Sequence, residues 1–299
     1  MEREQQKGYL MVFAAGCLWG TIGLFGTLLQ NMGMNPSAVA FFRLLFASVL
    51  MIPVLLVKGK GLRLFRISRR GLLSCLLVGL FSQAIYNALY MTTLKHTGMA
   101  ITAVLLYTSP VFVAIMSRLF FGEALRRNKI LAIIINILGC ILTVTGGQLA
   151  GLSLLSIGLL TGVGAGFMYA TLPVLSRIGA DREDPYTSTF YGLSFGALFL
   201  FFIVRPWQGI GAAFTPSMAL TLLGFGIIPS ALAYIVYFGG LGHIRETSKV
   251  PVLASVETVV ASLIGLFVFS QPLGIVKVLG IALVLVSILI MNKKTPERL

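Results

Sequence analysis

Charge is the property this sequence has least of. Charged residues are 11% of the 299 residues, and Asp and Glu together number only nine, whereas a soluble domain has about 25% charged residues. Several stretches contain no Asp, Glu, Lys or Arg: 8–42, 71–94, 96–117, 130–176, 185–204 and 206–244. A membrane-spanning helix needs about 20 apolar residues, and each stretch holds one or two such helices. This scarcity of charge excludes an ordinary soluble protein and predicts an integral membrane protein.

Cysteine and histidine are also rare, with three and two residues. Cys17, Cys75 and Cys140 lie inside apolar runs and lack the spacing of zinc ligands, so no metal site is expected. No Gly-x-x-x-x-Gly-Lys-Ser/Thr motif is present, which argues against an ATP-driven pump. The net charge of +14 arises from basic residues in short loops between apolar runs. We therefore expect no nucleic-acid partner and no cofactor.

The apolar runs predict an all-α integral membrane fold of ten transmembrane helices. The expected spans are 8–30, 36–57, 71–93, 97–120, 129–147, 152–175, 186–204, 216–238, 248–269 and 273–292. The first run is longer than the apolar region of a secretory signal, which is about 7–15 residues, and we expect it to remain as the first helix.

Basic residues predict the orientation of the chain. With the N-terminus inside, 19 of the 23 Lys and Arg fall on the cytoplasmic side. Only Lys95, Arg205 and Lys277 fall outside, and Arg43 lies within a span. Because cytoplasmic loops are enriched in basic residues, we expect a multi-pass protein of the cytoplasmic membrane with both termini in the cytoplasm.

An internal repeat relates the two halves of the chain. Trp19-Gly20 corresponds to Tyr169-Ala170, the segment 90–96 to 237–243, and the segment 119–125 to 267–273, at offsets of 147 to 150. The expected units are five-helix repeats at 8–147 and 152–292. Since five is odd, the second unit enters the membrane from the opposite face. This 5+5 inverted-topology repeat is a recurring architecture of transporters, with a binding site near the midplane between the halves.

In its motifs, the sequence resembles the drug/metabolite transporter superfamily, specifically ten-helix transporters with two EamA-type domains. The resemblance covers nearly the whole chain. The residues that carry it are Trp19-Gly20, Arg43, Pro110-Val-Phe-Val-Ala114, Phe121-Gly-Glu-Ala-Leu125, Ser255-Val-Glu-Thr-Val-Val-Ala261 and Gln271-Pro-Leu273. One departure is Gln271, which stands where many relatives have an acid.

This resemblance implies a secondary transporter, not an enzyme, that moves small metabolites such as amino acids or related amines across the cytoplasmic membrane. Export or exchange by alternating access is expected, and the transport is either coupled to protons, as in some relatives, or facilitative, as in others. The expected partners are a small-molecule substrate, protons and membrane lipids, and the expected state is a monomer or weak homodimer. The alternatives are an intramembrane enzyme and a flippase for lipid-linked substrates. An enzyme would need a nucleophile with a His or acid partner, or paired acids.

Two charged residues, Arg43 and Glu257, lie deep within predicted spans. A charge at the middle of a bilayer costs roughly 2.5–3.5 kcal/mol and normally faces a cavity or a partner. Glu257 is expected either to bind a proton, a cation or a substrate amine, or to form a fixed structural contact. For Arg43 the favoured interpretation is structural, as a clamp to backbone carbonyls or a snorkelling charge, with a gating role as the alternative.

Polar and aromatic residues predict the lining of a cavity for a small zwitterion, because such a solute needs amide and hydroxyl partners within aromatic walls. Gln83 and Asn87 are the strongest polar candidates, since amides at lipid depth need partners. The full set of candidate substrate- or ion-binding residues is Glu257, Gln83, Asn87, Tyr86, Tyr90, Trp19, Tyr169, Tyr234, Ser255 and Thr258. Pro110, Pro173, Pro229 and Pro251 are expected to kink spans 4, 6, 8 and 9.

Overall fold

The computed structural model describes residues 2–148, 157–180, 183–209 and 215–292. Within these ranges every regular element is helical, and ten segments are long and apolar enough to cross a membrane. The predicted ten-helix membrane fold is confirmed, although 152–156, at the start of the second expected repeat, lie outside the described ranges. Large apolar side chains such as Leu160, Phe267 and Ile275 are 78–81% exposed, as expected for a surface that faces lipid.

The first five spans run from Arg3 to Thr145. Span 1 consists of α1 (Glu2–Trp19) and α2 (Ile22–Asn31), and span 2 is α3 (Pro36–Lys58), which the turn η1 (Leu62–Phe65) follows. Span 3 contains α4 (Arg69–Leu77), the π-helical segment η2 (Val78–Ile85) and most of α5 (Tyr86–Leu106). Span 4 contains the last residues of α5 and the whole of α6 (Ser109–Phe121). Span 5 is α7 (Arg127–Thr145).

The last five spans run from Ile157 to Asn292. Span 6 is α8 (Ile157–Ala180), span 7 is α9 (Pro185–Val204), and the turn η3 (Pro206–Gly209) follows it. Span 8 contains α10 (Pro216–Gly226), the π-helical segment η4 (Ile227–Leu232) and α11 (Ala233–Leu241). Span 9 contains the turn η5 (Thr247–Lys249), α12 (Val250–Ala254) and α13 (Val256–Phe269), and span 10 is α14 (Ile275–Asn292).

The boundary between spans 3 and 4 differs from the prediction. Span 3 continues to Met99 and span 4 begins at Ile101, so Lys95 and His96 belong to the last turns of a helix instead of a connecting loop. The chain turns at Gly98, whose φ of 77° is a conformation that glycine adopts without steric cost. Hydropathy alone does not reveal which residue makes such a turn.

Helix irregularities occur at equivalent places in the two halves. The π-helical segments begin at Val78 in span 3 and at Ile227 in span 8. Span 4 is broken around Tyr107, between α5 and α6, and span 9 is broken at Ser255, between α12 and α13. The offsets of 149 and 148 match those of the sequence repeat. Pro173 was expected to kink span 6, but it coincides with no break between helices, because α8 runs through it as a single element.

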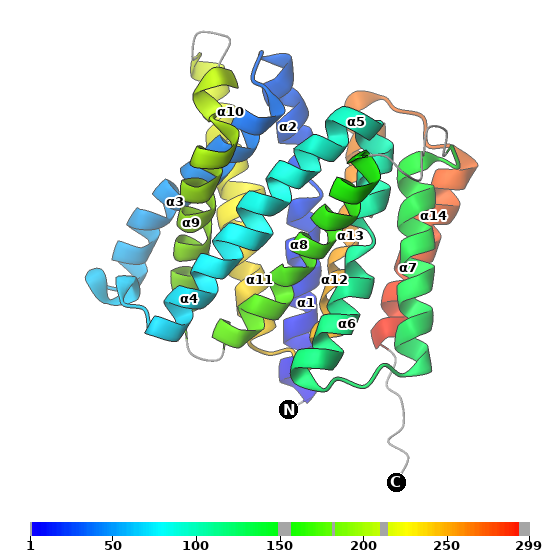
Figure 1. Cartoon of the computed structure of the whole chain (residues 1–299), viewed down its shortest axis with the longest axis horizontal. Helices are drawn as coiled ribbons and strands as arrows, with labels where there is room; N and C mark the ends of the chain where they lie inside the picture. Colours follow the sequence, from blue (N-terminus) through cyan, green and yellow to red (C-terminus); the bar gives the residue numbers. More distant parts are fainter. Residues whose placement is uncertain (1, 149–156, 181–182, 210–214, 293–299) are drawn as a thin grey trace.

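The two halves have opposite orientations in the membrane. Figure 1 shows the N-terminus and the end of α14 at one end of the bundle, which we call the terminal face. The connection from α6 to α7 lies at this terminal face, whereas its repeat counterpart, from α13 to α14, lies at the opposite face. This is the inverted arrangement that the odd number of helices per repeat predicts.

Glycines allow span 1 to pack closely on span 9. A Cβ atom added at Gly16 would lie 2.6 Å from the carbonyl oxygen of Ala254, and one at Gly20 would lie 2.9 Å from that of Glu257. The α7–α14 pair packs in the same manner, since a Cβ at Gly139 would lie 2.7 Å from the backbone nitrogen of Val284. Small residues permit this backbone approach in lipid, and here they fix the helices that surround the helix breaks.

Candidate functional site

A cavity of about 210 Å³ lies where helices of both repeats meet. It extends from the breaks in spans 1 and 9 toward the opposite face, because Ile22 and Gly23 of α2 and Ala261 of α13 lie beyond those breaks along the chain. Its walls are formed by Trp19, Gly20, Ile22, Gly23, Arg43, Ser82, Tyr86, Tyr90, Leu106, Tyr107, Tyr169, Tyr234, Glu257, Thr258 and Ala261. Eight of the residues predicted from the sequence are thus brought to one cavity: Trp19, Arg43, Tyr86, Tyr90, Tyr169, Tyr234, Glu257 and Thr258.

Glu257 lies in the first turn of α13, directly after the break at Ser255. The N-terminal end of a helix carries a partial positive charge that favours a carboxylate. Among the described residues Glu257 forms no ion pair, and no hydrogen bond to its carboxylate is found. Its side chain therefore faces the cavity and is available to a ligand in this conformation.

Arg43 lies on the wall formed by α3 and is only 7% exposed. Its guanidinium carbon is 5.8 Å from the centroid of the Phe225 ring, a distance at which a cation is attracted to an aromatic face. Within the described part of the chain Arg43 has no acidic partner. The cavity thus contains one cationic and one anionic side chain that do not pair with each other.

Aromatic rings form most of the remaining wall. Tyr86 packs against Tyr169, from the other repeat, with ring centroids 5.3 Å apart, and against Tyr90 at 5.8 Å. Trp19 contacts Tyr234 at 5.5 Å in an edge-to-face arrangement and Tyr237 at 4.9 Å. Such rings supply apolar contact and attract cations at their faces.

A second cavity, of about 30 Å³, lies on the side of the terminal face. Five residues line both cavities and form the boundary between them: Trp19, Leu106, Tyr107, Tyr169 and Glu257. The small cavity has enough room for a water molecule or a single ion. Ser255, another predicted residue, lies here and accepts a hydrogen bond from the side-chain nitrogen of Asn136 at 2.6 Å.

The two predicted amides, Gln83 and Asn87, do not line either cavity. Gln83 is buried and donates a hydrogen bond to the hydroxyl of Tyr234 at 2.5 Å. Asn87 donates to the backbone carbonyl of Gln83 at 2.6 Å, beside the π-helical segment η2. The structure thus places these amides behind the aromatic wall, where they orient Tyr234 and satisfy the local backbone.

Sequence reasoning missed Asn136 of α7, which donates to both Ser255 and Ser287. The available signal was an amide in the uncharged stretch 130–176. A buried amide in a spanning helix needs hydrogen-bond partners, and here the bonds tie α7 to the break in span 9 and to α14.

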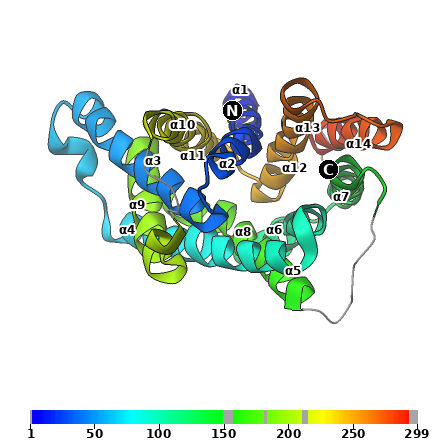
Figure 2. The ribbon, with the colours of Figure 1, turned by 90° about the horizontal axis from the view of Figure 1, so that it is seen from above.

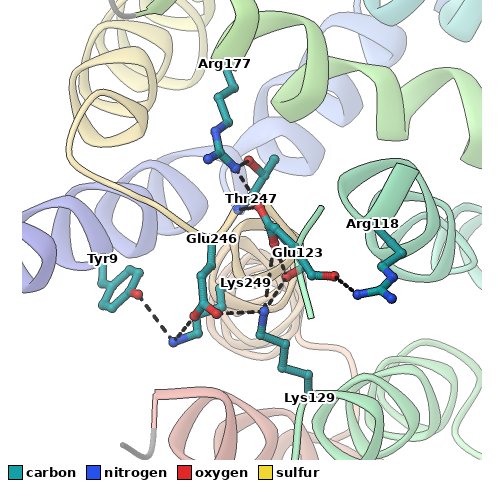
Figure 3. Close-up of polar contacts among 9 residues, drawn as sticks. Tyr9, Arg118, Glu123, Lys129, Arg177, Glu246, Thr247 and Lys249 are labelled. Atoms are coloured by element: carbon teal, nitrogen blue, oxygen red, sulfur yellow. Dashed lines mark hydrogen bonds and ion pairs between the residues drawn. The ribbon is translucent and has the colours of Figure 1, made fainter. Parts of the chain in front are cut away.

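A polar cluster lies at the terminal face, and Figure 3 shows its members Glu123, Lys129, Arg177 and Thr247. Ser248 is the fifth member, because it also bonds to the Glu123 carboxylate. One carboxylate oxygen of Glu123 accepts from Arg177 Nη1 and from the backbone nitrogen of Thr247, both at 2.6 Å. The other accepts from the hydroxyl of Ser248 at 2.6 Å and its backbone nitrogen at 3.1 Å. We call this set the Glu123 cluster.

The Glu123 cluster joins the two repeats. Glu123 follows Gly122, whose φ of 66° turns the chain at the end of α6, and its carboxylate is buried between α8 and the start of span 9. Lys129 Nζ lies 3.8 Å from a Glu123 oxygen and donates to Ser248 at 3.2 Å. The sequence motif identified Glu123 only as a loop residue, and nothing in the pattern indicated its burial.

Further ion pairs extend from the Glu123 cluster. The Glu246 carboxylate contacts Lys129 Nζ at 2.8 Å and Lys249 Nζ at 2.6 Å. Partial burial acts to raise the pKa of Glu246, but the hydrogen bonds and charges of these two lysines outweigh it and hold the pKa below its ordinary value.

The opposite face lacks a counterpart of the Glu123 cluster in the described ranges. Residue 271, the repeat equivalent of 123, is Gln271 and is exposed. None of the ion pairs among the described residues lies near it. Among the described residues, the buried ion pairs therefore gather at the terminal face, and the central cavity extends toward the opposite face.

Comparison with known proteins identifies similar chains. The profile of the EamA-like transporter family matches residues 6–145 and 156–293. A chain named "Uncharacterized transporter" from Archaeoglobus fulgidus is 27% identical over 96% of this chain and 97% of its own. The "Uncharacterized inner membrane transporter YicL" of Salmonella typhimurium is 24% identical over 98% and 97%. A solved crystal structure superposes with a TM-score of 0.80 over 96% of each chain at 18% identity, which supports the fold alone.

Proposed function

Since the chain belongs to the EamA-like transporter family and is a membrane transporter, we propose that it exports small zwitterionic metabolites, amino acids or related amines, by alternating access. The observation that carries this proposal is the presence of Arg43 and Glu257, without ion-pair partners among the described residues, in one aromatic-walled cavity. Charged residues within a membrane normally mark a substrate or ion pathway.

Each part of a zwitterion has a suitable partner in the cavity. The planar guanidinium of Arg43 can donate two parallel hydrogen bonds to a carboxylate, and the carboxylate of Glu257 can accept from an ammonium group. The rings of Trp19, Tyr86 and Tyr169 provide contact for an apolar or aromatic side chain. The volume of about 210 Å³ suits a solute of amino-acid size and is too small for a lipid-linked carrier.

The Glu123 cluster supports alternating access. We place the terminal face in the cytoplasm because of the excess of basic residues on that side, so the conformation described is closed to the cytoplasm and has its cavity toward the outside. In the alternate state, spans of the two repeats rock against each other and the contacts of Glu123 with Arg177 and with Thr247 and Ser248 separate.

Proton coupling follows from the position of Glu257. Its carboxylate faces both cavities and lies beside the break in span 9, so it can exchange a proton on one side and meet a substrate amine on the other. A carboxylate that holds a proton cannot also hold an ammonium group, so binding of the proton and binding of the substrate are mutually exclusive. Such competition at one site is the simplest way to exchange an inward-moving proton for an outward-moving substrate.

The test is counterflow in proteoliposomes at equal pH on both sides. The panel contains amino acids, amines without a carboxylate, carboxylates without an amine, and nucleobases. We expect exchange to be strongest for amino acids. In Arg43→Gln, the exchange rate of amino acids and of carboxylates should fall tenfold or more, while the exchange rate of amines should fall less. Exchange restricted to nucleobases, or equal loss for every solute in Arg43→Gln, would contradict the proposal.

A further inference from the structure

Several oxygen atoms that lack their usual partners converge on the small cavity beside Glu257. The volume of this cavity is about 30 Å³, which is room for one water molecule or one small ion. Figure 2 views the bundle from above and shows α12 and α13 facing α6 and α8, with α7 beside α6. Residues of all five helices line the cavity, so a ligand there contacts both repeats.

Two prolines free backbone carbonyls at this cavity. Proline has no N–H group, so the carbonyl four residues earlier loses the donor that a regular helix supplies. Pro110 removes the donor for Leu106, and Pro173 removes the donor for Tyr169. All four residues line the small cavity, and neither carbonyl accepts a hydrogen bond from a turn or loop of the described chain. Freed carbonyls of membrane helices are groups that coordinate sodium in transporters.

Side-chain oxygens add to these carbonyls. Ser109 is only 4% exposed, yet its hydroxyl has no hydrogen-bond partner among the described residues. The Ser255 hydroxyl accepts from Asn136 and donates to the carbonyl of Val252, which leaves one of its lone pairs unused. Together with the unpaired carboxylate of Glu257, the cavity presents one carboxylate, two hydroxyls and two carbonyls to a ligand.

The charge of the lining indicates the type of ligand. Among the described residues, Glu257 is the only charged one that lines the small cavity. An ion of charge +1 therefore makes the site neutral, whereas a divalent ion leaves an excess charge at lipid depth. No group of three or more His, Cys, Asp or Glu side chains gathers within the described ranges, and oxygen ligands alone disfavour a transition metal. Among alkali ions, a carboxylate attracts sodium more strongly than potassium because the charges lie closer together.

We propose that the small cavity binds a sodium ion between Glu257, Ser109, Ser255 and the carbonyls of Leu106 and Tyr169. The ion neutralises the Glu257 carboxylate without a proton and joins α6, α8 and α13. This inference rests on the proposed function only through the shared carboxylate, for which sodium, a proton and a substrate amine become alternative partners.

The test measures sodium binding to the full-length protein, purified in a mild detergent, and needs no substrate. The melting temperature is followed at constant ionic strength in chloride salts of sodium, potassium and N-methyl-D-glucamine, since a ligand of the folded state raises it as the ligand concentration increases. We expect sodium to raise the melting temperature and the other two cations to leave it unchanged. The same melting temperature in all three salts would overturn the proposal, and an equal rise in sodium and potassium would reject the preference for the smaller ion.

Ser109→Ala removes one ligand of the ion, and its matched control is Ser117→Ala. Both serines are buried in α6 with hydroxyls that have no hydrogen-bond partner among the described residues, but Ser117 does not line the cavity. Because losing one polar partner of a charged group typically weakens an interaction by roughly tenfold, Ser109→Ala should bind sodium about tenfold more weakly, and Ser117→Ala should match the parent within about twofold. Equal loss in the two variants would show a general effect of packing in α6 and contradict the site.

Glu257→Gln should remove the sodium effect altogether, because the lining then carries no negative charge. Sodium stabilisation that persists in this variant would place the ion elsewhere and overturn the proposal. Substrate counterflow in sodium-free buffer tests the proposed function separately. A failure of counterflow therefore leaves the sodium site standing, and a failure of the sodium response leaves the proposed substrates standing.

Discussion

At the scale of single residues, Glu257 is the group whose role can be separated most sharply. It faces the cavity from the first turn of α13 and has no ion-pair partner among the residues that the structure describes. Glu257→Gln keeps the size of the side chain and one acceptor oxygen, but it removes the negative charge and the ability to exchange a proton. We expect transport driven by a pH gradient to fall to the background level, while counterflow at equal pH continues with a weaker affinity for solutes that carry an ammonium group.

The control for this prediction is Glu4→Gln, which changes a 60%-exposed acid outside the cavity and should leave both assays unchanged. If Glu257→Gln responded to the pH gradient as the parent does, Glu257 would be a structural residue and the proposed coupling would be wrong.

Residue identity predicted the cavity wall better than it predicted the polar contacts behind it. Aromatic and charged residues within apolar spans were sufficient to select Trp19, Tyr86, Tyr169 and Glu257, because such groups are uncommon at lipid depth and converge on a cavity. Gln83 was selected by the same reasoning but supports Tyr234 from behind. A helix pattern gives the face of a residue only if the helix is regular, and the π-helical segment η2 rotates that face.

At the scale of elements, the close packing of α1 on span 9 can be tested at Gly16. A side chain there meets the backbone of Ala254 at 2.6 Å, and backbone yields less than a flexible side chain. Gly16→Val should therefore lower the free energy of unfolding by about 1–3 kcal/mol, the usual cost of overpacking. Chemical unfolding in mixed micelles measures this change.

Gly23 is the matched control, because a Cβ atom there meets nothing within 4 Å and the residue lines the central cavity. Gly23→Val should change the free energy of unfolding by less than about 0.5 kcal/mol while reducing transport. Equal destabilisation by the two substitutions would contradict the assigned packing of α1.

The connection from α11 to α12 is joined to α7 by Glu246, and this contact predicts a pH dependence. The pKa of Glu246 is lowered in the folded protein, so its stabilising effect is complete above the ordinary value of 4.5 and is lost as the pH falls through the lowered value. Glu246→Gln should melt at a lower temperature than the parent at pH 7. The difference should shrink only below about pH 4.5 and vanish at still lower pH. A difference that is constant from pH 7 to pH 3 would show that the charge of Glu246 is not the cause.

At the scale of the whole molecule, the repeat explains why the fold could be predicted from the sequence. It also explains why the contacts of the Glu123 cluster at the terminal face could not. Five helices per unit and the order of matched motifs were enough to give opposite orientations, since these follow from counting spans. The closure depends on how loops of different repeats meet, as Glu123 meets Arg177 and the backbone of Thr247. No sequence pattern states that a charged loop residue is buried between distant elements, so the Glu123 cluster emerged only from the structure.

The difference between the two faces predicts which conformation is favoured. The carboxylate of Glu123 is buried in hydrogen bonds at the terminal face, whereas its repeat equivalent Gln271 is exposed and uncharged at the opposite face. An inverted repeat with identical halves would have two conformations of equal free energy, one for each face. Buried hydrogen bonds to a charged acceptor contribute roughly 1.5–3 kcal/mol each, so this asymmetry favours closure of the terminal face.

Glu123→Gln should therefore shift the population by about tenfold or more toward the state that is open at the terminal face. A cysteine at position 23, introduced after Cys17, Cys75 and Cys140 are replaced by alanine, reports this shift through labelling with a membrane-impermeant maleimide from the opposite face. We expect slower labelling in the Glu123→Gln background and unchanged labelling with Glu4→Gln. Equal rates in all three proteins would mean that the conformational preference arises from packing of the spans and not from the buried carboxylate.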